Sequence, residues 1–151
     1  MTPSPAYDLT TAVMTTAAAF LRESQRFFRP FGLTAAQYNV LNILAPCADG
    51  VSQRELSDTL VVDRSNVTGL LDRMEEAGWV KRSDDPKDRR VYRVTLSAAG
   101  RKLWAKVEPK YLDAVRQITR GLSVAQMQAC TAALREMEQA APRLQVPEDS
   151  K

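Results

Sequence analysis

The sequence predicts a mainly helical fold that carries one small β-hairpin. Two observations support this class. Apolar residues recur three or four residues apart before residue 78 and after residue 97, as expected for helices that bury one face. Between these regions, over 79–97, the apolar period changes to two, which is typical of strands. Apolar residues make up 44% of the 151 residues, which is enough for a packed core.

The first predicted helix covers residues 8–28 and ends at the Pro-Phe-Gly sequence of 30–32, because proline and glycine both stop helices. Two capping boxes then predict helix starts at 34–37 and 52–55. In a capping box, a Ser or Thr side chain and a Gln or Glu three residues later satisfy each other's free backbone amides. The helix begun at 52–55 is short and extends through Leu60.

A brief break at 61–63 separates this short helix from a longer one. Asp63 is a suitable N-cap, and Gly78 favours the left-handed conformation that ends a helix, so the helix is predicted from residue 63 to about Ala77. One of its faces is apolar at the spacing of a buried stripe. That face comprises Val67, Leu70, Leu71 and Met74. The opposite face is mostly small and polar, and begins with Arg64, Ser65, Asn66, Thr68 and Gly69.

The hairpin is predicted from strands at 79–82 and 91–97 and a turn at 84–88. It is rich in cations, with six Lys and Arg side chains against three Asp between residues 81 and 93. The cations are Lys81, Arg82, Lys87, Arg89, Arg90 and Arg93. Phosphate binding depends on where cations point. This cluster is therefore a stronger indication of nucleic-acid binding than the net charge of +3 and the pI near 9.0. A solvated charged turn is the alternative interpretation.

Two further helices follow the hairpin. The first, from about residue 98 to Gly121, contains Pro109, which predicts a bend. The capping box at 123–126 starts the last helix, whose apolar residues repeat at spacings of three and four, like the seam of a coiled coil. The seam comprises Met127, Cys130, Leu134, Met137, Ala141 and Leu144. It packs either within the chain or against a second copy across a two-fold axis.

The order of short helix, break, helix and charged hairpin is that of a winged helix-turn-helix, predicted here over 34–100. In such a domain the second helix enters the DNA major groove, where small polar side chains and Gly69 approach base edges. An ordinary amphipathic helix would explain that face, but it would not explain the cations of the hairpin. Arg89 and Arg90 lie at the predicted hairpin tip, where they can enter a minor groove.

The run DRSNVTGLLDRMEEAGWVKR at 63–82, then DPKDRR at 85–90 and VTLSAAG at 94–100, resembles the signature of the MarR family of transcriptional regulators. The resemblance implies a single domain over 1–151, with helices at about 8–29 and 101–144 that intertwine in a homodimer. Two positions depart from the family pattern, Ser57 where Ala is common and Val61 where Gly is common. These departures predict a slightly different turn within the same fold.

The resemblance also implies roles for single residues. Asp88 and Arg90 correspond to the family's Asp-x-Arg element in the wing, with Arg90 in the minor groove, and Lys87 and Arg89 lie beside them. Arg73 would brace the recognition helix against the wing or a phosphate. We therefore expect a regulator that binds double-stranded DNA at an inverted-repeat operator, specifically a repressor released by a small aromatic or anionic ligand. Candidate residues for binding that effector are Arg22, Tyr38, Trp104 and Tyr111.

Three other functions are possible for such a chain: an enzyme, a metal-sensing repressor and a module that binds only proteins. The amino-acid composition disfavours the first two. The chain has no His and two Cys, Cys47 and Cys130, so it lacks the usual acid–base, zinc and disulfide chemistry. We expect no enzyme activity, no cofactor and no metal, which disfavours an enzyme and a metal-sensing repressor. A winged-helix module that binds only proteins is the third. Both cysteines are expected to be inert packing residues.

The amino-acid sequence also bears on where the protein acts. No apolar run approaches the roughly 20 residues that a membrane-spanning helix needs. Residues 1–8 have neither the basic cluster nor the apolar segment of a secretory signal. A cytoplasmic protein is therefore expected.

Overall fold

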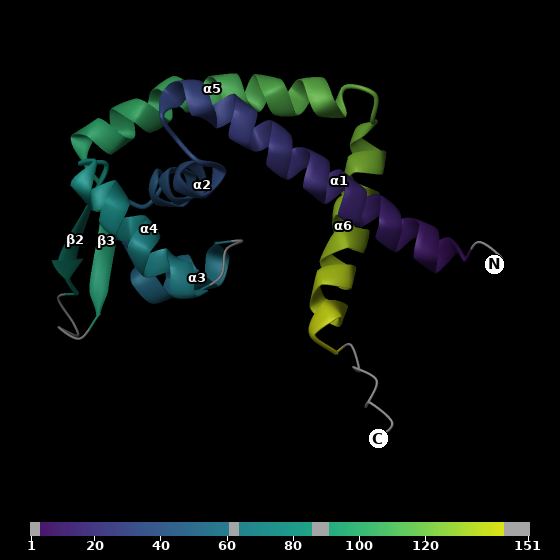
Figure 1. The fold of residues 1–151 in the computed structure, drawn as a ribbon, viewed down its shortest axis with the longest axis horizontal. Coiled ribbons are helices and arrows are strands. Elements are labelled where there is room, and N and C mark those ends of the chain that lie inside the picture. Colours follow the sequence, from purple (N-terminus) through teal and green to yellow (C-terminus); the bar gives the residue numbers. More distant parts are fainter. Residues whose placement is uncertain (1–3, 61–63, 86–90, 144–151) are drawn as a thin grey trace. The chain divides into compact units, whose positions relative to one another are not determined.

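The computed structural model describes residues 4–60, 64–85 and 91–143, without the side chains of Arg64 and Ser65 (Figure 1). Its helices are α1 (Pro5–Phe28), α2 (Ala35–Leu44), α3 (Gln53–Thr59), α4 (Arg64–Glu76), α5 (Ala98–Thr119) and α6 (Val124–Ala140), with 3₁₀ turns η1 (Arg29–Phe31) and η2 (Ala141–Arg143). Its strands are β1 (Val51–Ser52), β2 (Val80–Asp84) and β3 (Tyr92–Leu96). The predicted class, mainly helical with a small β-hairpin, is confirmed.

Local sequence signals explain where most helices begin and end. All three predicted capping boxes are present, with both reciprocal hydrogen bonds formed: Thr34 with Gln37, Ser52 with Glu55, and Ser123 with Gln126. Gly32 and Gly78 adopt the left-handed conformation just beyond helical segments, as predicted for Gly78. α1 starts at Pro5 rather than Asp8, because proline is well suited to the first position of a helix.

The sheet has three antiparallel strands in the order β1-β3-β2. The predicted hairpin is β2 paired with β3, in the register Val80 opposite Leu96 and Asp84 opposite Tyr92. Asp84 was expected in the turn but extends β2, and β3 begins at Tyr92 rather than Val91. Asp85 follows β2, and its amide donates to the Val91 carbonyl at 2.8 Å, whereas residues 86–88 of the predicted turn lie outside the described residues.

The two-residue strand β1 was not predicted, because two residues show no period. It pairs Val51 with Val94. Gly50 precedes it with a φ of 75°, and a Cβ atom there would lie 2.6 Å from Thr95 Cγ2 and 2.7 Å from the Val94 carbonyl oxygen. Glycine therefore supplies both the left-handed conformation and the space that β1 needs to pair with β3.

The apolar face predicted for α4 is buried and joins the core of the winged region. Leu71, Met74 and Val67 are fully buried, and Leu70 is nearly so. α4 contacts α2, α3 and β2, which contribute other fully buried residues, among them Leu41, Leu44 and Leu56. Burying one such aliphatic side chain stabilises the fold by roughly 1.5–3 kcal/mol. This packing fixes the orientation of α4, so its opposite face points outward.

The hairpin is also anchored at its base, where β3 leads into α5. The Ser97 hydroxyl donates to the Gly78 carbonyl and accepts from the Gly100 amide at 2.9 Å. Gly100 packs directly on Trp79, since a Cβ at this position would lie 2.0 Å from the Trp79 carbonyl oxygen. The first turn of α5 therefore holds the segment that connects α4 to β2.

The chain divides into two compact units, residues 1–109 and 110–151, and the division falls at Pro109 inside α5. The predicted single domain over 1–151 and its boundaries stay predictions. In the second unit, α6 has no buried residue among those described. Of its predicted seam, Met127 and Met137 are half-buried, Cys130, Leu134 and Ala141 are exposed, and Leu144 lies outside the described residues.

None of the helices in the described part of the chain combines the length and the apolar character required to cross a membrane.

Candidate nucleic-acid interface

The outward face of α4 carries the residues predicted to contact DNA. Asn66, Thr68 and Arg73 are exposed, and Gly69 is half-buried. Arg64 and Ser65 lie in the first turn of the helix, but their side chains are outside the described residues. The predicted wing residues Lys87, Asp88, Arg89 and Arg90 also lie outside them. The described part of the candidate interface is thus the middle of α4 and the strands beside it.

Gln53 contacts this face from a neighbouring helix. It is the first residue of α3, and its side-chain Nε2 donates a hydrogen bond to Thr68 Oγ1 at 3.0 Å. Gln53 was not among the residues predicted from sequence, because it lies 15 residues from Thr68. It also lies within the Ser52–Glu55 capping box, which accounts for the helix start without any further role for Gln53. The structure therefore adds Gln53 to the candidate interface.

Arg82 joins β2 to the same helix. Its Nη1 lies 2.6 Å from Asp72 Oδ1 and 3.4 Å from Glu75 Oε2, and its Nη2 donates to the Thr68 carbonyl at 3.3 Å. The Arg82 backbone amide also donates to Glu75 Oε1 at 3.1 Å. The Arg82 side chain is 19% exposed. Its charge is thus paired with two carboxylates inside the domain, which corrects its prediction as a cation available to phosphate.

Arg93 is engaged in a similar way at the base of the wing. Its Nε donates to Asp85 Oδ2 at 2.7 Å, and its Nη1 donates to the carbonyls of Asp49 and Gly50 at 3.1 and 2.9 Å. The hydrogen bond to Asp85 raises the pKa of the Arg93 guanidinium. Arg93 therefore ties β3 to the segment before β1, and it too differs from a free surface cation.

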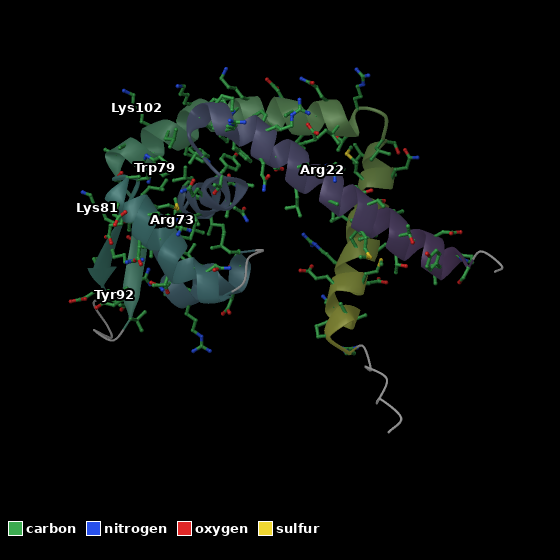
Figure 2. The ribbon with its side chains drawn as sticks, viewed as in Figure 1. Arg22, Arg73, Trp79, Lys81, Tyr92 and Lys102 are labelled. Carbon is green, nitrogen blue, oxygen red and sulfur yellow. The ribbon has the colours of Figure 1, made fainter. Side chains whose placement is uncertain are left out.

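The two arginines leave Lys81 as an exposed cation among the described residues of the hairpin (Figure 2). Tyr92, at the start of β3, is 52% exposed. An open groove of about 370 Å³ lies between α3 and β3, lined by Gln53, Arg54, Ser57, Val91 and Tyr92. This groove borders the predicted DNA-binding face, since Gln53 belongs to both.

Arg73 lies in the last turn of α4 and is exposed. Its Nη1 would lie 3.6 Å from a Cβ atom at Gly69, so its guanidinium lies along the exposed side of α4 (Figure 2). Within the described residues the helix is braced against the wing by Arg82 rather than by Arg73. A contact from Arg73 to phosphate stays a prediction.

Glu55 belongs to the helix that supports α4. Its side chain accepts the Ser52 amide at 2.8 Å, and its own amide donates to the Ser52 hydroxyl at 3.1 Å. These hydrogen bonds to Ser52 are the main reason that the pKa of Glu55 is lowered from its ordinary value. Glu55 is therefore a structural carboxylate that fixes the first turn of α3, where Gln53 lies.

The residues suggested for an effector differ in burial and in their described contacts. Tyr38 is a core residue, 4% exposed, whose ring stacks on Phe28 with a centroid separation of 4.6 Å. Arg22 is exposed on α1 (Figure 2), and Trp104 is half-buried with its Nε1 donating to Asn42 Oδ1 at 3.3 Å. Tyr111 belongs to the second unit and is half-buried there. Their roles stay predictions.

The two cysteines differ in accessibility. Cys47 is half-buried and Cys130 is exposed in the single chain, so their expected role as inert packing residues stays a prediction. Cys130 lies on the seam of α6, which packs on little else in its own unit. Among the described residues, no group of three or more His, Cys, Asp or Glu side chains is arranged to hold a metal ion.

The fold and this face together define a winged helix-turn-helix protein, and comparison with known proteins narrows the class. A family model described as the MarR family matches residues 31–91. The homoprotocatechuate degradative operon repressor of Escherichia coli is 30% identical over 114 residues, which cover 73% of this chain and 76% of the relative. The chain belongs to the MarR family.

Two solved structures extend the match over most of the chain. A MarR mutant from E. coli, complexed with operator DNA, is 26% identical with a TM-score of 0.75, over 86% of this chain and 93% of that one. CouR from Rhodococcus jostii RHA1, bound to p-coumaroyl-CoA, is 25% identical with a TM-score of 0.76, over 97% and 100%. The chain spans about half the length of the first curated relatives it matches, at identities up to 43%.

Proposed function

We propose that this protein is a transcriptional repressor that binds double-stranded DNA in a sequence-specific manner. One observation carries the proposal: the polar face of α4 points outward and is held in place from both sides, by Gln53 of α3 and by Arg82 of β2. A helix presented in this way fits the major groove, where side chains read base edges. The family relationship and the operator complex of a similar structure support the same function.

The two arms of the interface have different tasks in this proposal. Thr68, Asn66, Ser65 and Gly69 approach base edges, whereas Arg64 and Arg73 neutralise phosphates near the start and the end of α4. The wing residues Lys87, Asp88, Arg89 and Arg90 form the second arm, with Arg90 in the minor groove. Base contacts specify the sequence and phosphate contacts position the protein.

A homodimer would present two such helices to one inverted repeat, with half-site centres about 10 bp apart. Exposed apolar side chains on the outer helices support this assembly. On α1 they are Tyr7, Leu9, Met14, Phe20 and Leu21; from α5 to α6 they are Leu112, Val115, Ile118, Leu122, Val124 and Leu134. Such an amount of exposed apolar surface is typical of residues that are buried by a partner. A DNA target of this kind supports the cytoplasm as the proposed location of the protein.

A salt titration of DNA binding tests the proposal. Wild type and Arg90→Ala are titrated against selected operator DNA and random DNA, between about 50 and 200 mM salt. If Arg90 contacts DNA, Arg90→Ala weakens binding to both and reduces the salt slope by about one unit per lost phosphate contact. A wild-type protein that selects no sequence from a random pool would instead favour a module that binds only proteins.

Release by a ligand is the second part of the proposal. It is supported by the similar structure bound to p-coumaroyl-CoA, an aromatic and anionic molecule. Arg22, Trp104 and Tyr111 remain candidates for contacting such a ligand, and so does Tyr38, which is a core residue. Titration of the protein–operator complex with p-coumarate and its CoA thioester tests this part, because an effector must lower DNA affinity by binding the DNA-free form more tightly.

A further inference from the structure

The hydroxyl group of Thr68 has a defined direction. Gln53 Nε2 donates a hydrogen bond to Thr68 Oγ1 at 3.0 Å. An amide NH₂ group donates and cannot accept, so it occupies a lone pair of the hydroxyl oxygen and leaves the hydroxyl proton to point elsewhere. Thr68 is exposed on the face of α4 that is proposed to meet DNA.

Several other helical threonines of this chain use that proton within the helix, although Thr11 and Thr16 of α1 do not among the described residues. Thr59, Thr119 and Thr131 each donate it to the carbonyl four residues earlier, at 2.8, 2.9 and 2.8 Å. Within the described residues, Thr68 makes no such bond, although it also stands inside a helix. Among the described residues the Thr68 proton therefore has no acceptor, which leaves it for an acceptor on the DNA.

The groups around Thr68 keep this arrangement in place. The Thr68 carbonyl accepts from Arg82 Nη2, so the backbone of this turn is fixed from the wing side. Gln53 is held by the capping box that starts α3, and its carbonyl accepts from the Ser57 hydroxyl at 2.9 Å. Donor and acceptor thus belong to two helices that pack on each other, and little reorganisation is needed on binding.

We propose that Gln53 is a specificity-determining residue, because it makes the Thr68 hydroxyl a hydrogen-bond donor toward the DNA. A donor at this place selects a base that offers an acceptor in the major groove, such as guanine O6 and N7 or thymine O4. It discriminates against the amino group of cytosine. This inference rests on the proposed function, and it adds a named chemical preference at one position of each half-site.

The test reverses the polarity of the pair with little change of shape. In Gln53→Glu, a carboxylate replaces the amide and can only accept, so the Thr68 proton turns toward it and a lone pair faces the DNA. The new charge weakens binding to every sequence, so the measured quantity is the relative base preference in half-sites selected from a randomised pool. We expect the preference at one position to move from guanine or thymine toward cytosine, by about tenfold.

Thr68→Val supplies the matched control, because it keeps the shape of the side chain and removes the hydroxyl. In the Thr68→Val background, Gln53→Glu carries the same charge but should leave base preference unchanged. Thermal unfolding of each variant shows that the fold is retained. If Gln53→Glu still shifts the base preference in the Thr68→Val background, the role assigned to the Thr68 hydroxyl is wrong. The role assigned to Gln53 is also wrong if Gln53→Glu alone keeps the wild-type base preference. A wild type that selects no sequence overturns the proposed function as well, so the two failures are distinguishable.

Discussion

α4 and α6 carry apolar stripes of the same kind, and their surroundings differ completely. The stripe of α4 is buried against α2, α3 and β2, with Leu71 and Met74 fully enclosed. The stripe of α6 has no buried residue among those described, and Leu134 at its centre is 42% exposed. The spacing of apolar residues therefore predicts that a helix has an apolar face. It does not predict whether that face packs against other parts of the same chain or against a second protein.

The two stripes should therefore differ in how their contribution to the free energy of unfolding depends on protein concentration. The α4 stripe should stabilise the folded chain at any protein concentration, since its partners lie in the same chain. The α6 stripe should stabilise only an assembled form, so its contribution should depend on protein concentration. The following substitutions test this contrast and then the details of the DNA-binding face.

Leu71→Ala should have the largest effect on folding. The side chain is fully buried, so its truncation removes buried methyl groups and leaves a cavity. We expect a loss of about 3 kcal/mol in the free energy of unfolding, measured by denaturant titration. The loss should be the same at micromolar and at tenfold higher concentration. A loss below about 1 kcal/mol would contradict the assignment of this face to the core.

Leu134→Glu should break the assembly instead. In a two-fold interface this substitution buries an unpaired charge, and it should convert the dimer to a monomer of about 16.8 kDa in sedimentation experiments. DNA affinity should fall with it. Ala132→Glu is the matched control, because Ala132 is equally helical and exposed but lies off the seam. Equal sedimentation of the two variants would rule out the seam as the interface.

Arg82→Lys should lower DNA affinity much more than it lowers the stability of the fold. Lysine keeps the charge but cannot reach Asp72, Glu75 and the Thr68 carbonyl together. Because both carboxylates are about half exposed, we expect a stability loss of only about 1 kcal/mol. DNA affinity should fall on the order of tenfold for all sequences, since α4 and the wing are no longer held in register.

Arg116→Lys provides the control for this change. Arg116 pairs with Asp113 within one exposed turn of α5, with side chains 74% and 65% exposed. The same substitution there should change neither unfolding nor DNA binding. If Arg82→Lys behaves like Arg116→Lys in a DNA titration, the contact between β2 and α4 has no role in binding.

Much of the fold could be predicted because its signals are local. The three capping boxes and Gly78 each depend on a few neighbouring residues, so they mark helix ends without knowledge of the rest of the chain. The apolar face of α4 was predicted correctly for the same reason. β1 was missed because its pairing with β3 joins residues more than 40 positions apart.

The candidate site was harder to predict for the same physical reason. Thr68 and Gly69 were selected from the outward face of a helix, which is a local property. Gln53, Arg82 and Arg93 act through partners that only the tertiary structure brings near them. From sequence, Arg82 and Arg93 were counted as cations available to phosphate, whereas both are occupied by acceptors of the domain itself.

Gly69→Ala should increase stability while weakening DNA binding. Glycine inside a helix costs about 1 kcal/mol relative to alanine, and a Cβ atom here would meet only Arg73 Nη1, at an ordinary 3.6 Å. Nothing among the described residues therefore requires glycine at this position. We expect a higher unfolding midpoint together with a several-fold lower affinity for operator DNA, because the added methyl group separates α4 from the groove. Unchanged affinity would show that the backbone makes no close approach there.

Glu55→Gln should have the smallest effect, confined to acidic pH. The pKa of Glu55 is lowered in the folded protein by its hydrogen bonds to Ser52, so the carboxylate stabilises the fold above the unfolded pKa of about 4.3. That contribution is lost as the pH falls through the lower, folded pKa. Glutamine keeps an acceptor for the Ser52 amide but does not titrate, so the variant should lose less stability than wild type between about pH 5 and pH 3. Unfolding midpoints measured across this range test the sign: parallel curves would mean that the capping bond at Glu55 is no stronger for the charged form than for a neutral one.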